Sequence, residues 1–127
     1  MTSFDVDTDR RTQVLDVTDR VEDALPVDAD GTATVFSRHT TAGVAVNEAE
    51  PRLMEDVESS LGALVADDGW AHDALDGNAD AHLRAMLVGP AATVPVTDGA
   101  LDVGTWQSVL IVECDGPRTR TLEVRTG

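Results

Sequence analysis

Three histidines are the side chains of this 127-residue chain that best suit acid–base or metal chemistry. His39 follows the apolar segment TATVFS, whereas His72 and His82 bound the polar string HDALDGNADAH. If this string folds back on itself, His72 and His82 meet at one site, although the spacing does not show whether His39 joins them. Three imidazoles with an open fourth position would suit Zn²⁺ or another divalent ion. The spacing alone matches no recognised ligand pair and favours three separate histidines at the surface or in hydrogen bonds.

Carboxylate and amide oxygens lie between His72 and His82. Asp76, Asn78 and Asp80 have the spacing of the first three ligands of a calcium-binding loop. The match then fails, because Ala81 stands where the sharp turn needs glycine, and the twelfth position is Leu87 rather than glutamate. The same oxygens could hold Mg²⁺, or Asn78 and Asp80 could cap a helix, and the pattern favours capping.

Hydroxyl groups and arginines form a candidate anion site. Thr40 and Thr41 follow His39 at the end of a predicted strand, where their hydroxyls and backbone N–H groups could line a phosphate or carboxylate site or form an ordinary turn. Arg118 and Arg120 follow the DGP turn, and we expect them to lie on opposite faces of a strand, so that at most one of them readily reaches this site. Pairing with a carboxylate is the default role of either arginine.

The charge of the chain limits its partners and its catalytic chemistry. Against 24 acidic residues stand 9 basic ones, all arginine, and the net charge is −15. This charge argues against binding to nucleic acid or to an anionic membrane. The absence of lysine and tyrosine excludes Schiff-base chemistry and acid–base catalysis by those residues. An acidic, lysine-free composition is typical of haloarchaeal cytoplasmic proteins, whose surface charges are screened by salt.

The sequence predicts a cytoplasmic protein, because it has no signal-like N-terminus and no long apolar run. Its single cysteine, Cys114, lies in the apolar run VLIVEC and is predicted to be a buried core thiol. The length suits one domain over residues 1–127.

The pattern of apolar residues predicts an α+β domain with mainly antiparallel sheet and two to three helices. The first predicted helix begins at Thr18, the second spans about 51–66, and the third begins at Asn78 or Asp80 and ends at Gly89-Pro90. In the last of these, we expect Leu83, Met86 and Leu87 to face the core. Predicted strands are 11–17, 32–37, 42–46, 92–96, 100–103, 106–114 and 118–125, and those after residue 91 read as a meander of hairpins. Trp106 and Gln107 could line a pocket, but a packed core tryptophan is favoured.

Four ordered motifs make nearly the whole chain resemble the YjbQ family, also called UPF0047. They are HTTAG followed by NE, the H…DGNADAH loop, G-x-W-Q and DGPR-x-R. The resemblance implies a small α+β fold, a homotrimer and a site at or near subunit boundaries. It implies catalytic or metal-binding roles for His39, His72 and His82, and catalytic roles for Asn47 and Glu48. The substrate-binding residues that it implies are Thr40, Thr41, Asp76, Asn78, Asp80, Gln107 and Arg118.

The resemblance also implies an activity, that of a secondary thiamine-phosphate synthase. This reaction joins a pyrimidinylmethyl diphosphate to a thiazole phosphate and releases diphosphate, so the site must hold two anions. A divalent ion such as Zn²⁺ or Mg²⁺ together with Arg118 could stabilise the departing diphosphate. One alternative is a metal-dependent hydrolase or lyase acting on another phosphorylated metabolite. Another is a trimer that binds a metal or metabolite without catalysis.

Overall fold

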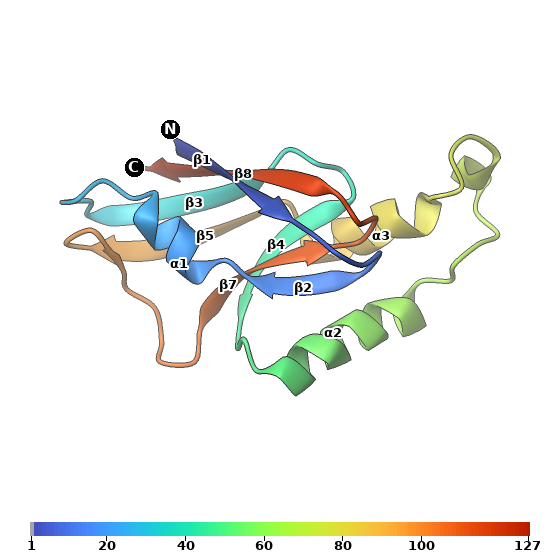
Figure 1. Ribbon diagram of the computed structural model, residues 1–127, viewed down its shortest axis with the longest axis horizontal. Coiled ribbons are helices and arrows are strands. Elements are labelled where there is room, and N and C mark those ends of the chain that lie inside the picture. Colours follow the sequence, from blue (N-terminus) through green and yellow to red (C-terminus); the bar gives the residue numbers. More distant parts are fainter. Residues whose placement is uncertain (1) are drawn as a thin grey trace.

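The computed structural model describes residues 2–127, in which two antiparallel sheets and three α-helices form the α+β arrangement that the sequence predicts (Figure 1). The larger sheet has the strand order β1-β8-β3-β5-β6, and the smaller sheet has the order β2-β7-β4. The strands are β1 (Thr2–Asp7), β2 (Gln13–Asp16), β3 (Gly31–Ser37), β4 (Ala42–Asn47), β5 (Ala91–Thr97), β6 (Ala100–Leu101), β7 (Ser108–Glu113) and β8 (Thr119–Thr126). The helices are α1 (Thr18–Asp23), α2 (Pro51–Leu64) and α3 (Ala79–Val88), with a short 3₁₀ helix, η1 (Ala71–Ala74).

Strand β7 connects the two hydrophobic cores of the protein. Val109 and Ile111 point into a core between the two sheets, which α1 closes with Val21. Leu110 and Val112 point to the opposite face, where α2 and α3 cover the small sheet. A strand that is buried on both faces needs apolar residues at successive positions, and the run VLIV supplies them.

Local chemistry predicts both ends of α2 and the end of α3, but the favoured capping of α3 is wrong, because Asn78 makes no side-chain capping hydrogen bond and Asp80 lies within the helix. The side chain of Glu50 accepts a hydrogen bond from the backbone N–H of Leu53 and caps α2, and Pro51 occupies the first helical turn. Helix α3 ends at Gly89, whose φ of 96° is accessible to glycine at low cost. Cys114 is buried as predicted, and this burial raises its pKa to about 11.

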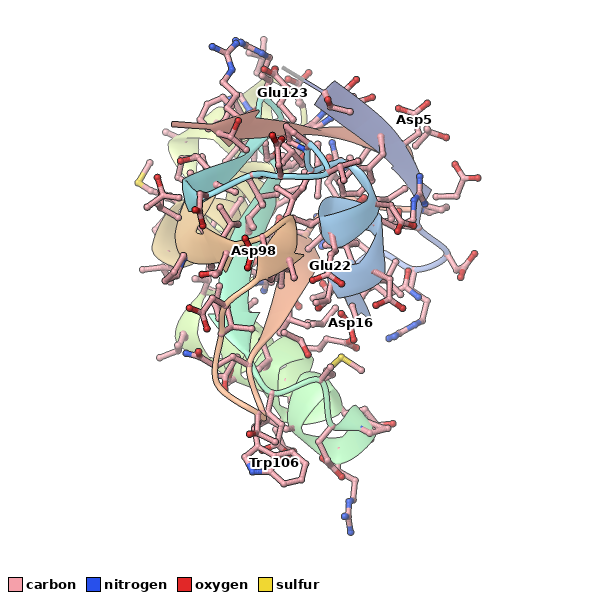
Figure 2. The ribbon with its side chains drawn as sticks, turned by 90° about the vertical axis from the view of Figure 1, so that its left-hand side faces the viewer. Asp5, Asp16, Glu22, Asp98, Trp106 and Glu123 are labelled. Atoms are coloured by element: carbon pink, nitrogen blue, oxygen red, sulfur yellow. The ribbon has the colours of Figure 1, made fainter. Side chains whose placement is uncertain are left out.

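Three of the predictions on packing are wrong. The strands after residue 91 do not form a meander, because only β5 and β6 pair as a hairpin, while β7 and β8 join different sheets. Met86 and Leu87 are exposed, because α3 buries the face that carries Ala81 and Ala85 instead. Trp106 is 72% exposed and protrudes from a loop rather than packing in the core (Figure 2).

Acidic side chains cover much of the surface. Asp5, Asp16, Glu22 and Asp98 come from separate segments of the chain and lie on the face shown in Figure 2. None of the helices within residues 2–127 is long and apolar enough to cross a membrane. The strand β1, which the sequence analysis did not predict, pairs with β8 along its full length and extends the larger sheet.

Candidate functional site

The turn between β3 and β4 presents the HTT motif at one edge of the two sheets. Ser37, the last residue of β3, donates a hydrogen bond from Oγ to the carbonyl oxygen of Ala42 (2.9 Å) and accepts one from the backbone N–H of His39 (3.2 Å). Ser37 is buried, so both hydrogen bonds are shielded from water. This serine therefore fixes the turn on which His39, Thr40 and Thr41 are displayed.

A buried ion pair between Arg120 and Glu113 stabilises the same turn. Arg120 donates from Nε to Glu113 Oε1 (2.8 Å) and from Nη2 to Thr41 Oγ1 (2.8 Å). Thr8 donates a further hydrogen bond to Glu113 Oε1 (2.8 Å). Burial raises the pKa of Glu113, but the hydrogen bonds from Arg120, the backbone N–H of Asp115 and Thr8 outweigh it and hold that pKa below its ordinary value. Glu113 is thus held as a carboxylate, and Arg120 couples it to Thr41.

Gly43 allows β4 to approach the end of α3. A Cβ atom at this position would lie 2.6 Å from the carbonyl oxygen of Gly89 and 2.8 Å from Val88 Cγ1. The same approach lets the backbone N–H of Val44 donate to the carbonyl oxygen of Gly89 (3.0 Å). The glycine of the HTTAG motif therefore sets how closely α3, which carries His82, packs against the HTT turn.

Asp80 anchors α3 and is closed to any ligand. It is fully buried, and Arg11 binds its two carboxylate oxygens at 2.8 and 2.9 Å. Arg84, which is also buried, donates to Asp80 Oδ2 and to the carbonyl oxygens of Leu61 and Val65 at the end of α2. The expected substrate-binding role of Asp80 is therefore corrected to a structural one, since its oxygens already bind two arginines.

A polar cleft of about 390 Å³ lies between the HTT turn, α3 and the segment that precedes β8. Its basic lining residues are Arg38, His39, His82, Arg118 and Arg120. Its other lining residues are Thr40, Thr41, Asp76, Asn78 and Asp115. The protein carries nine basic residues other than histidine and a net charge of −15, so three arginines at one cleft are a marked local concentration.

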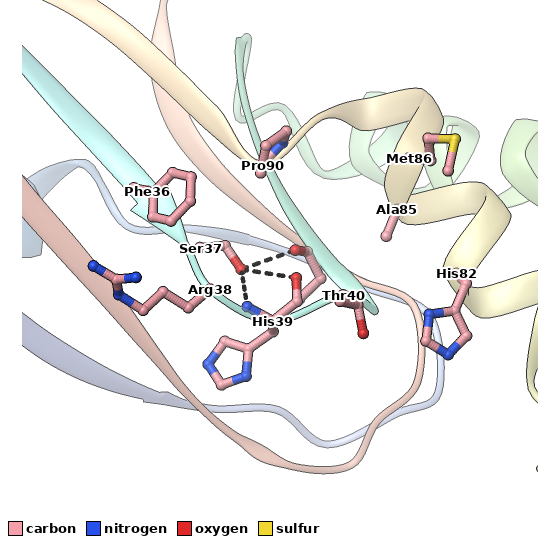
Figure 3. Close-up of a pocket in the computed structure, with 10 residues that line it drawn as sticks. Phe36, Ser37, Arg38, His39, Thr40, His82, Ala85, Met86 and Pro90 are labelled. Carbon is pink, nitrogen blue, oxygen red and sulfur yellow. Dashed lines mark hydrogen bonds between the residues drawn. The ribbon is translucent and has the colours of Figure 1, made fainter.

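His39 and His82 stand on different walls of this cleft. His39 accepts a hydrogen bond at Nε2 from the backbone N–H of Thr121 (3.0 Å), so a neutral imidazole carries its proton on Nδ1. His82 extends from α3 toward Thr40 (Figure 3). Both imidazoles line the polar cleft, and a ligand bound there would contact both walls.

The two arginines of the DGPR-x-R motif both line the cleft. The expectation that at most one would do so was wrong, because side chains two residues apart in an extended segment lie on the same face. Arg118 precedes β8 and is held by Asp115, to which it donates from Nε (2.9 Å, carbonyl oxygen) and Nη2 (3.2 Å, Oδ2). Its side chain is about half exposed. Its Nη1 group makes no hydrogen bond to residues 2–127, so it is free to bind a ligand. Arg120 is buried, and its Nε and Nη2 hold the turn through Glu113 and Thr41.

His72 contacts His82 but opens into a neighbouring pocket. The two ring centroids are 5.0 Å apart in an edge-to-face arrangement, and both residues line a pocket of about 330 Å³ together with Trp70, Ala79 and Leu83. His72 Nε2 lies 3.7 Å from Asp76 Oδ2. Asn78 donates from Nδ2 to Asp115 Oδ2 (3.0 Å), which connects this region to the anchor of Arg118.

The three histidines do not converge as a metal-binding trio. Within residues 2–127, no three side chains of the histidine, cysteine, aspartate or glutamate type are grouped so as to hold a metal ion. His39 Nε2 is already hydrogen-bonded to the backbone, and His72 and His82 meet on the other side of the cleft. Within one protomer His39 therefore stands apart from His72 and His82, and a Zn²⁺ or Mg²⁺ site at these residues stays a prediction.

Asn47, Glu48 and Gln107 lie at the far end of β4, away from the histidines. The six residues of β4 separate its two ends by roughly 17 Å at ~3.3 Å per step. Gln107 Oε1 accepts a hydrogen bond from the backbone N–H of Gly104 (2.8 Å) and closes the loop that displays Trp106. Glu48 and Trp106 line a shallow pocket beside the start of α2. The predicted site residues thus divide into two groups within one protomer.

Besides Arg120, two residues of the cleft were not predicted as site residues. Arg38 directly precedes His39, and its guanidinium lies 5.6 Å from the centre of the Phe36 ring while it forms an ion pair with Glu123. Asp115 orients both Asn78 and Arg118. Arg38 and Asp115 could have been identified from the sequence, because Arg38 directly precedes the HTT motif and Asp115 is the first residue of DGPR.

Comparisons with known proteins identify the family of the chain. The family model described as "UPF0047 protein YjbQ-like" matches residues 2–126. A UPF0047 protein of Methanothermobacter thermautotrophicus is 46% identical over 120 residues, which cover 92% of this chain and 84% of that protein. The UPF0047 protein YugU of Bacillus subtilis is 33% identical over 129 residues, which cover 97% of this chain and 96% of that protein. The crystal structure of a hypothetical protein from Aeropyrum pernix K1 superposes with a TM-score of 0.94 at 48% identity and covers 99% of this chain and 96% of that one. The chain therefore belongs to the YjbQ-like UPF0047 family.

Proposed function

We propose that this protein is a small-metabolite enzyme with thiamine-phosphate synthase-like activity, and that its substrates bind in the polar cleft. The observation that carries the proposal is the half-exposed Arg118 beside His39 and His82 in one polar cleft of a protein that is otherwise strongly acidic. An acidic surface repels phosphorylated metabolites, so only a locally basic cleft can bind them. Guanidinium groups suit phosphate because they donate several hydrogen bonds in one plane.

The proposed reaction forms one carbon–nitrogen bond and breaks one carbon–oxygen bond. The ring nitrogen of the thiazole phosphate supplies the electron pair that attacks the methylene carbon of the pyrimidinylmethyl diphosphate. Diphosphate leaves with the electron pair of the broken carbon–oxygen bond, and the thiazole nitrogen becomes positively charged without losing a proton. Negative charge grows on the leaving oxygen, so the main task of the protein is to stabilise an anion.

Arg118, His39 and His82 each have a defined part in this proposal. Arg118 binds the departing diphosphate through Nη1, while Asp115 holds the rest of its guanidinium in place. His39 offers its Nδ1 as a donor, since its Nε2 is occupied by the backbone of Thr121. His82 closes the cleft from α3 and supplies a second imidazole for proton transfer to diphosphate.

The second group of motif residues leads us to place the active form in a homotrimer. Asn47, Glu48 and Gln107 cannot contact a ligand in the cleft of their own protomer, because β4 separates them from it. Trp106, on the same loop as Gln107, is 72% exposed, and an exposed tryptophan is typical of interface anchors. In a trimer with sites at subunit boundaries, this end of one protomer lies beside the cleft of the next.

The activity is tested with both phosphorylated precursors in molar KCl, with and without added Mg²⁺ or Zn²⁺, by measuring thiamine phosphate and diphosphate together. We expect the two products in equal amounts, and we expect Arg118→Gln to reduce kcat/KM by about a hundredfold. Arg125→Gln is the matched control, because Arg125 is an exposed arginine of β8 that does not line the cleft. Absence of turnover with intact phosphate binding would favour a non-catalytic binding protein. Equal activity of the two variants would contradict the proposed site.

A further inference from the structure

A second, apolar pocket opens directly beside the polar cleft. It has a volume of about 530 Å³, and it shares Arg38, His39, Thr40 and His82 with the cleft. The two cavities are therefore adjacent, and a ligand that is large enough can contact residues of both. Figure 3 shows the pocket between the end of β3 and helix α3.

Apart from Ser37, the rest of the pocket lining is apolar. Phe36 comes from β3, Ala85 and Met86 come from α3, and the other apolar lining residues are Ala42 and Pro90. Met86 is 75% exposed although it is apolar, and Phe36 is half-buried. The exposure of Met86 contradicted the expectation that it belongs to the core, and a role in binding accounts for an apolar side chain at this position.

The walls of the pocket suit a flat ring. The guanidinium of Arg38 lies over the Phe36 ring at 5.6 Å and is held there by Glu123, so one planar surface is fixed in place. The flexible thioether of Met86 is positioned on the opposite side, on α3 (Figure 3). Aromatic side chains and thioether sulfurs both make favourable contacts with an aromatic ring, and each contact contributes modestly to the binding free energy.

We infer that the ligand of this site is a phosphate ester of an aromatic or heteroaromatic group, with its phosphate in the polar cleft and its ring in the apolar pocket. This inference rests on the proposed anion-binding role of the cleft and adds a specificity-determining role for Phe36 and Met86. A phosphorylated sugar or a free phosphate would leave the apolar lining in contact with water. The site therefore discriminates in favour of ring-bearing phosphates.

The inference is tested by calorimetric titration of the full chain in molar KCl with inorganic phosphate and with phenyl phosphate. We expect phenyl phosphate to bind at least ten times more tightly than phosphate. Met86→Gln keeps the length of the side chain and adds no charge, and it should lower this preference about threefold while leaving phosphate affinity unchanged. Leu87→Gln is the control, since Leu87 is an exposed neighbour on α3 that does not line the pocket.

The outcomes separate this inference from the function on which it rests. Equal binding of the two ligands by the unaltered protein, or an equal effect of Met86→Gln and Leu87→Gln, would overturn the role of the apolar pocket but leave the anion cleft intact. Arg118→Gln should weaken both ligands alike and preserve their ratio. If neither ligand binds, both the cleft and the pocket assignments are wrong.

Discussion

The replacement Asp80→Asn tests whether the buried charge network of α3 positions the cleft. The variant keeps the size of the side chain but removes the charge that faces Arg84, which is itself 3% exposed. Breaking a buried ion pair costs about 3–5 kcal/mol because a charge stays buried without its partner. Arg11 is nearly half exposed and recovers hydration, and Asp67 still pairs with Arg84, so we expect the lower value, about 3 kcal/mol.

This loss of free energy corresponds to a measurable change in melting temperature. A chain of 127 residues has an unfolding entropy of about 0.27 kcal/mol/K near its melting point, so ~3 kcal/mol lowers Tm by roughly 11 °C. Calorimetric melting in molar KCl measures this shift, with Asp68→Asn as the control because Asp68 is exposed and lies just beyond α2. A shift of less than ~2 °C, or an equal shift in the control, would refute the reasoning.

The same variant should change the response of the protein to acid. The hydrogen bonds from Arg11 outweigh the opposing effect of burial and lower the pKa of Asp80. A carboxylate with a lowered pKa in the folded state stabilises the fold above its unfolded pKa of ~3.9, and this contribution is lost as the pH falls through the folded value. The stability of the unaltered protein should therefore fall more steeply below pH ~4 than that of Asp80→Asn. Parallel acid-denaturation curves would contradict the assignment of this charge.

Three further predictions follow from assembly, surface charge and backbone packing. Light scattering in molar KCl should give the mass of a trimer, and a stable monomer at micromolar concentration would exclude sites at subunit boundaries. The melting temperature should rise between ~0.05 M and ~3 M KCl, because the Debye length becomes shorter than the distances between surface charges. A flat or falling curve would show that repulsion among the acidic residues does not limit the stability of the fold. Gly43→Ala should lower the free energy of unfolding by about 2 kcal/mol, as overpacking does, because the new Cβ would lie 2.6 Å from the Gly89 carbonyl oxygen. Gly62→Ala is the control, since a Cβ at Gly62 has open space. A Gly43→Ala protein that melts at the same temperature as the unaltered protein would contradict this close approach.

Local chemistry made most of the secondary structure predictable. The run VLIV predicted a buried strand because it is apolar at successive positions, and Glu50-Pro51 predicted the start of α2 because each residue suits its own place there. The segment TSFDVD, which forms β1, also alternates, and Phe4 and Val6 were a usable signal for that strand.

Tertiary packing determined what the sequence pattern left open. The strand β7 lies between β2 and β4 because its two apolar faces each meet a different core, and no local signal specifies such partners. In α3 the small residues Ala81 and Ala85 pack against the sheet, so the larger Met86 is displaced to the surface. A pattern that counts only apolar residues favours the larger ones and misses this choice.

The candidate site also combines features that local sequence predicts with features that depend on tertiary packing. The motifs identified His39, His82 and Arg118 as site residues, but their common cleft depends on Gly43, Glu113 and Arg120, which set the packing of the turn. The position of Gln107 at the opposite end of β4 also had no sequence signal, because its motif is compatible with either location.

The most direct test of the account is a crystal structure of the protein grown in molar KCl with thiamine phosphate. We expect the phosphate group in the polar cleft, hydrogen-bonded to Arg118 Nη1 and facing His39 and His82, with a ring of the ligand against Phe36 and Met86. A phosphate group bound at any other surface, or a cleft that contains only solvent at a saturating ligand concentration, would contradict the central claim that this cleft binds phosphorylated metabolites.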